Sequence, residues 1–186
     1  MKLVKPINFR NIDTVSTLDF MENMKKFKIN NNFAVAVSGG PDSLALMLLS
    51  NEFANHLDIK MTVICIDHNL RKNSSSEVKW VRSEAMKLGA HFITAKIPKN
   101  NLKSNLMSYA RDVRYKELYK ICSRKKIKVL LTAHHLDDEI ENFLMRLVRG
   151  SGIKGLSSLK EKSMVNNNKL QLIRPLLRYP KKSLIK

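Results

Sequence analysis

A short glycine- and serine-rich stretch carries the strongest chemical signal in the chain. It lies between an apolar segment, 33–38, and a helical pattern over 42–57. Adjacent glycines let the backbone turn tightly, so amide N–H groups and the N-terminus of the following helix can approach an anion. A serine hydroxyl adds a further donor. We therefore predict a phosphate-binding loop, which consists of Ser38, Gly39, Gly40, Pro41, Asp42 and Ser43.

Asp42 is the unusual member of this loop, because a carboxylate repels a bound phosphate unless a cation lies between them. The loop also lacks the Gly-Lys-Ser/Thr ending of a Walker loop. A magnesium ion at Asp42 would remove the repulsion, since Mg²⁺ prefers carboxylate and phosphate oxygens. The simpler interpretation is an ordinary strand–turn–helix in which Asp42 only caps the helix.

Polar side chains also follow two other apolar segments. Asp67 and His68 come at the end of the segment 60–67, and His134 directly follows 128–133. Ligands of open parallel sheets bind beyond the carboxyl ends of the strands. We therefore expect these residues in a ligand crevice, although Asp67 and His68 are also compatible with a plain turn. His134 is suited to binding phosphate, positioning a base or transferring a proton.

The next residues raise the question of which side chains face inward. Because adjacent histidines point in different directions, only His134, and not His135, is expected to act. By helical angle Asp137 turns towards the interior at the first turn, whereas Asp138 turns outward, where the helix dipole alone favours it. A zinc site is the rival, but H-H-x-D-D lacks H-E-x-x-H spacing and cysteine ligands. The expected buried stripe of this helix is Leu136, Ile140, Phe143, Leu144 and Leu147.

Two arginines fall inside or at the edge of an apolar arc on the expected helix 102–125. They are Arg111 and Arg114. An arginine that faces inward is costly unless it is paired. Glu117 is a possible partner for Arg114 at i,i+3 spacing. The alternative is that both arginines bind phosphate groups of a ligand, for which a planar bidentate donor is well suited.

An alternation of short apolar segments and helical segments must position these side chains. Apolar segments separated by helices are typical of strands buried on both faces of a parallel sheet. We therefore expect an α/β fold: an open parallel sheet of about five strands with helices on both faces. An extra helix is expected over 14–29. The expected strands cover 33–38, 60–67, 91–97, 128–133 and 170–174, and the other helices cover 42–57, 75–88, 102–125 and 136–149.

The charge points to a polyanionic partner. The 186 residues include 34 Lys+Arg and 16 Asp+Glu, which gives a formal charge of +18. The segment 145–186 holds 11 basic residues and 1 acidic residue, net +10, so the excess is concentrated there. Such an excess indicates nucleic acid as a partner, or only a lysine-rich solvated surface.

Several classes of protein are disfavoured by the same sequence. No apolar run approaches the roughly 18 residues of a membrane span, so no membrane partner is expected, and the N-terminus lacks the apolar region of a signal peptide. Cys65 and Cys122 are too few for a disulfide scaffold or a four-cysteine metal site. A reducing cytoplasm is the expected compartment.

Six motifs in order carry a family resemblance over 34–177. After S-G-G-x-D-S come D-H-x-L-R, A-R-x-x-R-Y, T-A-H-H-x-D-D-x-x-E, R-G-S-G-x-x-G-L and R-P-L-L. The first resembles the signature of the PP-loop ATP pyrophosphatases, and the ordered set resembles the tRNA(Ile)-lysidine synthetases. Members often carry Gln at Glu139 and Thr at Asn142. They continue past R-P-L-L into C-terminal tRNA-binding domains, so we expect this chain to be a truncated catalytic domain without them.

The resemblance implies a fold, a reaction and its participants. The fold would be of the adenine nucleotide alpha hydrolase type, with 1–31 as a helical extension and 32–186 as an ATP-binding catalytic domain. The loop, Asp67 and His68 would bind ATP, with Mg²⁺ near Asp42 and shared with Asp137. C2 of the wobble cytidine in CAU-anticodon tRNA(Ile) would be adenylated. Free L-lysine would then displace AMP to form lysidine. Arg111, Arg114 and His134 would orient the nucleotides, the basic segment from Arg146 would hold tRNA, and a homodimer is possible.

Two alternatives stay open at this point. The chain could be a non-catalytic remnant that binds ATP or RNA without turnover. It could also be a PP-loop tRNA thiolase, although those that modify cytidine or uridine carry C-x-x-C motifs. Cys65 and Cys122 lie far apart in the sequence, and each is expected to be a core residue rather than a catalyst.

Overall fold

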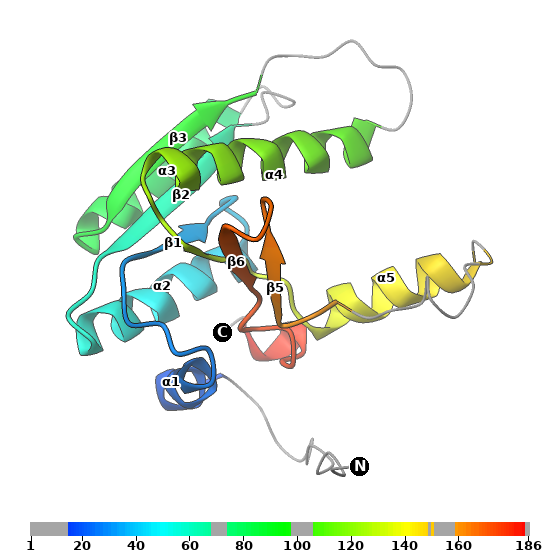
Figure 1. The fold of residues 1–186 in the computed structure, drawn as a ribbon, viewed down its shortest axis with the longest axis horizontal. Coiled ribbons are helices and arrows are strands. Elements are labelled where there is room, and N and C mark those ends of the chain that lie inside the picture. The colour runs from blue at the N-terminus through cyan, green and yellow to red at the C-terminus, as the bar shows by residue number, and fades with distance from the viewer. Residues whose placement is uncertain (1–14, 68–73, 98–105, 149, 151–158, 185–186) are drawn as a thin grey trace.

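A computed structural model describes residues 15–67, 74–97, 106–148, 150 and 159–184. Its centre is a six-stranded sheet with the strand order β3-β2-β1-β4-β6-β5 (Figure 1). Every pairing between neighbours is parallel except that of β5 with β6, which is antiparallel. The strands are β1 (Phe33–Ala36), β2 (Met61–Asp67), β3 (His91–Lys96), β4 (Val129–Leu131), β5 (Lys162–Val165) and β6 (Leu170–Ile173).

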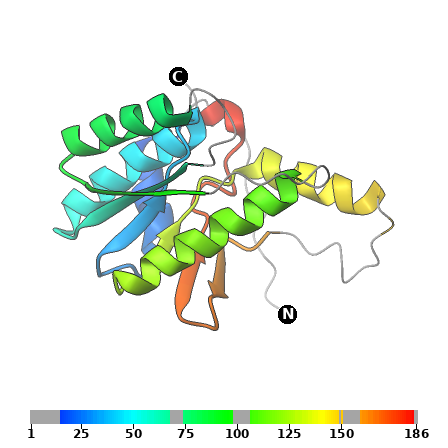
Figure 2. The same ribbon diagram turned by 90° about the horizontal axis from the view of Figure 1, so that it is seen from above.

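Helices cover both faces of the sheet (Figure 2). On one face, α1, α2 and α3 pack against side chains such as Phe33, Val35 and Val63. On the other face, α4 packs Leu118 and Ile121 against the opposite side chains of the same strands. The expected open α/β sheet with helices on both faces is therefore confirmed. The helices are α1 (Thr17–Lys25), α2 (Pro41–His56), α3 (Ser74–Lys87), α4 (Leu106–Arg124), α5 (Leu136–Val148) and the short 3-10 helix η1 (Lys181–Ser183).

The sixth strand, β5, was not expected from the sequence. It pairs with β6 through a hairpin whose turn residues Asn166, Asn167 and Asn168 all adopt left-handed backbone conformations. Asparagine tolerates that conformation better than other non-glycine residues. At the sheet edge, β5 alternates exposed and half-buried residues, so it lacks the continuous apolar run that identified the inner strands.

The helix α5 departs from expectation in a different way. Its apolar stripe was expected to be buried, but Ile140, Phe143, Leu144 and Leu147 are 43–52% exposed. The helix extends away from the sheet (Figure 1), and no element of the described part of the chain covers this stripe. Helical periodicity shows which face is apolar, whereas burial requires a neighbour that packs against it.

The helix α1 contributes to the main core although it precedes the first strand. Phe20 and Met24 are fully buried in the same cluster as Phe33 and Val35 of the sheet. Ser16 and Asp19 form a reciprocal capping box at its N-terminus, which satisfies two of the free backbone donors there. No described helix is long and apolar enough to cross a membrane.

The packing of α1 gives a stability prediction. Phe20→Ala should lower the free energy of unfolding by about 3–5 kcal/mol, because it removes a fully buried ring and leaves a cavity. Leu18→Ala, on the same helix but 77% exposed, should change it by less than about 0.5 kcal/mol. Urea denaturation measures both. Equal stability of the two variants would contradict the packing of α1 in the core.

Candidate functional site

The predicted phosphate loop lies between the end of β1 and the first turn of α2. Gly39 has φ +89°, a backbone conformation that favours glycine, whereas a Cβ there would make only ordinary contact with Val81 Cγ2 at 3.5 Å. Gly40 is the N-cap of α2, and Pro41 follows at the start of the helix. The loop therefore presents the positive end of the helix dipole at the carboxyl end of the sheet.

The Ser43 hydroxyl closes this loop from inside. It donates to the carbonyl of Gly40 at 2.8 Å, and it accepts from the amide of Ser38 at 3.2 Å. The two serine hydroxyls also lie 3.2 Å apart. These contacts hold the loop in a compact turn in which the hydroxyls of Ser38 and Ser43 lie together.

The carboxylate of Asp42 is only partly satisfied by its surroundings. Its Oδ1 is buried without a hydrogen-bond partner, and its Oδ2 lies 3.6 Å from Nε2 of His135. A buried carboxylate oxygen without a partner is costly. The arrangement fits a cation ligand better than a helix-capping residue, because no side-chain capping bond is made at this N-terminus.

His135 connects Asp42 to the start of α5. Its Nδ1 accepts from the amide of Asp138 at 3.3 Å, while its own amide donates to Asp138 Oδ2 at 2.9 Å. Because Nδ1 accepts, the ring proton belongs on Nε2, which faces Asp42. The sequence prediction chose His134 and passed over His135. The available signal was the position of His135 directly before the helix, with an acidic residue three positions later.

The prediction that Asp137 faces inward and Asp138 outward is wrong. The side chain of Asp137 is 56% exposed, against 38% for Asp138. Asp137 Oδ2 accepts from the amide of Lys181 at 2.6 Å and lies 3.7 Å from His135 Nδ1. Asp138 is drawn inward because it completes the cap with His135. Helical angle alone misses such a capping bond, which forms at the first turn.

His134 lies among cationic groups on the α4 side of the sheet. Its Nε2 is 3.2 Å from Arg111 Nη2, and its Nδ1 is 3.1 Å from Thr132 Oγ1. Burial, together with the smaller effects of the charges of Arg174, Arg111, Arg114 and His135, lowers the pKa of His134 to about 3. The imidazole is therefore neutral at physiological pH, and the structure does bring Arg111 and His134 together.

The partner considered for Arg114 is occupied elsewhere. Glu117 lies 3.6 Å from Lys120, whereas Arg114 and Arg111 each lie over the ring of Tyr115, at 5.4 and 5.7 Å from its centre. The apolar arc predicted that both arginines face inward. Arg114 is half-buried, in partial agreement, whereas Arg111 is exposed. Stacking on an aromatic ring holds a guanidinium while leaving its donors available.

Arg174 was not among the predicted site residues. It directly follows β6, just as Asp67 lies at the carboxyl end of β2. It is 8% exposed and donates from Nη1 to the Lys160 carbonyl at 2.8 Å and to Ser163 Oγ at 3.2 Å. Its Nε is buried without a partner. The signal that sequence reasoning could have used is the position of an arginine directly after an apolar strand.

The remaining predicted residues are only partly within the described structure. Asp67 is buried at the carboxyl end of β2, beside the strand that leads into the loop. His68 and the R-G-S-G-x-x-G-L segment, apart from Gly150, lie outside the described residues. Among the described residues, no group of three or more His, Cys, Asp or Glu side chains is arranged to hold a metal ion.

The two thiols are core residues, as expected. Burial raises the pKa of Cys65 to about 11 and that of Cys122 to about 12. Both side chains are free and buried, one within β2 and one within α4. Protonated, buried thiols are poor nucleophiles and poor metal ligands.

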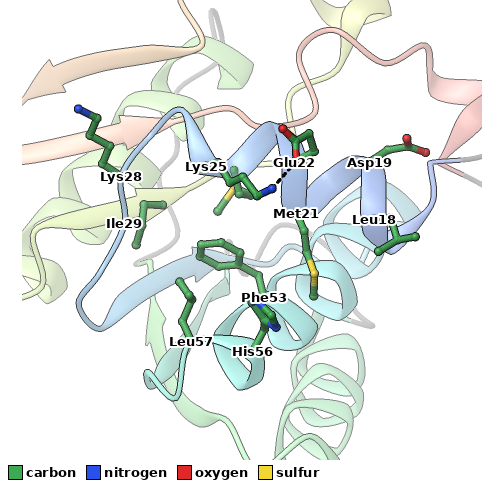
Figure 3. Close-up of a pocket in the computed structure, with 11 residues that line it drawn as sticks. Leu18, Asp19, Met21, Glu22, Lys25, Lys28, Ile29, Phe53, His56 and Leu57 are labelled. Atoms are coloured by element: carbon green, nitrogen blue, oxygen red, sulfur yellow. Dashed lines mark hydrogen bonds and ion pairs between the residues drawn. The ribbon is translucent and has the colours of Figure 1, made fainter.

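A pocket of about 610 Å³ lies between α1 and the C-terminal end of α2 (Figure 3). Phe53, Leu57 and Ile29 supply part of its apolar wall, and Lys25 and Glu22 pair at its rim. The phosphate loop lies at the N-terminal end of α2. This helix has 16 residues, so its two ends are about 24 Å apart. None of the predicted site residues lines this pocket, so it is separate from the candidate site.

The environment of His134 gives a pH prediction. Its pKa falls from 6.5 to about 3 on folding, so between these values the unfolded chain binds a proton that the folded chain does not. Stability is therefore complete above pH 6.5 and is lost as the pH falls. Lowering the pH from 7 to about 5 should cost wild type about 2 kcal/mol more than His134→Gln.

Urea denaturation at the two pH values measures this difference. His56→Gln, which changes an exposed histidine at the end of α2, should keep the pH dependence of wild type. An unchanged pH dependence in His134→Gln would contradict the proposed effect of burial and arginine charge.

Comparison with known proteins gives relatives over most of the chain. It is 46% identical over 153 residues to a tRNA(Ile)-lysidine synthase of Rickettsia bellii strain OSU 85-389, which covers 82% of this chain and 35% of that protein. It is 43% identical over 169 residues to a tRNA(Ile)-lysidine synthase of Rickettsia felis, covering 86% and 38%. The chain thus spans little more than a third of the length of these curated relatives.

Solved structures share the fold at low identity. A U34-tRNA thiolase of Methanococcus maripaludis superposes with a TM-score of 0.75 at 21% identity, covering 90% of this chain and 61% of that one. An NMN synthetase of Francisella tularensis gives 0.53 at 11% identity, covering 91% and 68%. The sequence matches the family described as the PP-loop domain over residues 13–186. The loop geometry, the sheet and this match together place the chain in the PP-loop domain family.

Proposed function

We propose that this chain is the adenylating domain of a tRNA(Ile)-lysidine synthetase, an ATP-dependent carbon–nitrogen ligase. The observation that carries the proposal is the compact Ser38–Ser43 loop at the N-terminus of α2, in a chain 41–46% identical to proteins of that name. Residues 32–186 form the ATP-binding unit in this proposal, with 1–31 as an N-terminal extension.

The loop binds the pyrophosphate part of ATP in this proposal. The backbone N–H groups at the start of α2 and the hydroxyls of Ser38 and Ser43 are the donors, and the helix dipole adds a favourable field. Asp67, buried at the end of the neighbouring strand, and His68 complete the nucleotide side of the crevice.

Asp42 is the proposed magnesium ligand, and its unpartnered, buried Oδ1 supports this role. Mg²⁺ is bound mainly by substrate phosphates and water, so one protein carboxylate is sufficient for it. When bound, the ion neutralises charge on the phosphates. Asp137 is a second proposed ligand, although His135 lies between it and Asp42, 3.7 and 3.6 Å from their carboxylates.

His134, Arg111 and Arg114 are proposed to orient the nucleotides. The neutral His134 accepts or donates hydrogen bonds without adding charge, and Arg111 contacts its ring. Fixed cationic donors stabilise the charge that develops on a transferring phosphate group. The cytidine oxygen attacks the α-phosphate, pyrophosphate leaves, and the amine of free lysine then displaces AMP.

The proposed partners are tRNA(Ile) with a CAU anticodon and free L-lysine. The net charge of +10 over 145–186 supports contact with an RNA backbone. Thiolation is the weaker candidate, because both cysteines are buried and their thiol pKa values are raised to about 11 and about 12. The cytoplasm is the proposed compartment, as the substrates of this reaction require.

Turnover distinguishes the ligase from a non-catalytic remnant. With ATP, free lysine and CAU-anticodon tRNA(Ile), the chain should release pyrophosphate, because it contains the proposed loop, Asp42 and the two arginines. Omitting the tRNA should abolish the release. Binding of ATP without any pyrophosphate release would instead favour the remnant.

Asp42 is the residue whose loss should separate chemistry from folding. Asp42→Ala should lower the adenylation rate by about 100-fold or more, the size expected for removing one electrostatic stabiliser of the reaction. Glu52→Ala, an exposed carboxylate on the same helix, is the matched control and should retain wild-type activity. Circular dichroism should show both variants folded, and full activity of Asp42→Ala would exclude the metal role.

A further inference from the structure

Three guanidinium groups gather on the α4 side of the sheet around His134. Arg111 and Arg114 come from α4 and share the ring of Tyr115 as a platform, and Arg111 contacts His134 directly at 3.2 Å. Arg174 comes from the residue after β6. No ion pair joins any of the three to a carboxylate within the described part of the chain.

Strand register explains why Arg174 reaches the same place. Leu130 is paired with Leu172 and Leu131 with Ile173, and the amide of Thr132 continues the ladder by donating to the carbonyl of Ile173 at 3.0 Å. Leu130 and Leu172 both pack towards α4. Because alternate strand residues face the same side, Arg174 faces α4 beside Thr132, whose hydroxyl contacts His134.

The cluster is electrostatically incomplete. Arg174 is 8% exposed, its Nε is buried without a partner, and its Nη1 bonds are made to neutral oxygens. The nearby carboxylates have other partners: Glu161 pairs with Lys26 and Arg178, and Glu117 pairs with Lys120. A buried cation without a counter-charge is costly, and two further cations nearby increase that cost.

The histidine within the cluster reports the same positive field. Arg174, Arg111 and Arg114 each lower the pKa of His134, after the larger effect of burial. The ring is therefore uncharged at neutral pH, so it neither adds to the positive charge of the arginines nor supplies a counter-charge.

We propose that Arg174 joins Arg111 and Arg114 to form a binding site for a phosphate group on the α4 side of the sheet. The Ser38–Ser43 loop is a different site, since it belongs to α2 on the opposite face. Planar guanidinium forks suit phosphate oxygens, and a buried fork held by Ser163 and Lys160 is already oriented. The inference rests on the proposed function, which supplies two sources for the bound phosphate: an RNA backbone or ATP.

Binding measurements with matched variants test this site. Arg174→Gln should weaken binding of a short CAU-anticodon RNA stem–loop about tenfold and reduce the slope of log Kd against log salt by about one. If ATP affinity falls instead, the bound phosphate belongs to the nucleotide. Arg178→Gln, an exposed arginine paired with Glu161, should bind both probes like wild type, and Ser163→Ala controls for loss of the Ser163 contact alone.

Two further measurements keep the proposal testable if Arg174→Gln does not fold. Arg111→Gln changes an exposed side chain and should show a similar loss of affinity for the same probe. In the wild-type chain, the NMR signal of the Arg174 Nε–H group should shift saturably with RNA, ATP or inorganic phosphate, while that of Arg178 should not. Unchanged affinities in Arg111→Gln together with an unmoved Arg174 signal would overturn the proposal. These measurements report binding and not turnover, so a failure of this site can be distinguished from a failure of the ligase activity.

Discussion

The parallel pairing of β1, β4 and β6 is the constraint on which the whole site depends. It brings the carboxyl ends of these strands to one edge, where the loop after β1, His134 and His135 after β4, and Arg174 after β6 all emerge. Because these strands are paired and their side chains pack against helices on both faces, their ends lie next to one another. Without this pairing, the phosphate loop at the start of α2 would not lie beside the side chains that follow β4 and β6.

The two adjacent histidines divide this edge chemically. His135 turns to the α2 side, where it contacts the carboxylates of Asp42, Asp137 and Asp138. His134 turns to the α4 side, among arginines. Carboxylates and guanidinium groups are therefore kept on opposite sides instead of neutralising each other. The α2 side therefore holds the Ser38–Ser43 loop and the carboxylates, and the α4 side holds the guanidinium groups.

The departures from expectation share a physical cause, which is the presence or absence of a neighbour. The apolar stripe of α5 follows helical periodicity, yet no described element covers it. The edge strand β5 forms because β6 offers a free side, although its own residues are half exposed. Asp138, not Asp137, turns inward because it bonds to His135. Periodicity describes one element at a time and contains no information on these partners.

Features that depend only on adjacent residues could be predicted from the sequence. These are the inner strands, the helices between them, and the Ser38–Ser43 loop, because glycine freedom, apolar runs and helix starts are local properties. Tertiary structure alone decided which side chains share a face. Capping bonds place His135 in the site, and strand register places Arg174 there. The contacts of Arg111 and Arg114 depend on the packing of α4 against the sheet. A local pattern can mark His135 before a helix or Arg174 after a strand as a candidate, but their contacts with residues distant in the chain arise from packing and cannot be read from it.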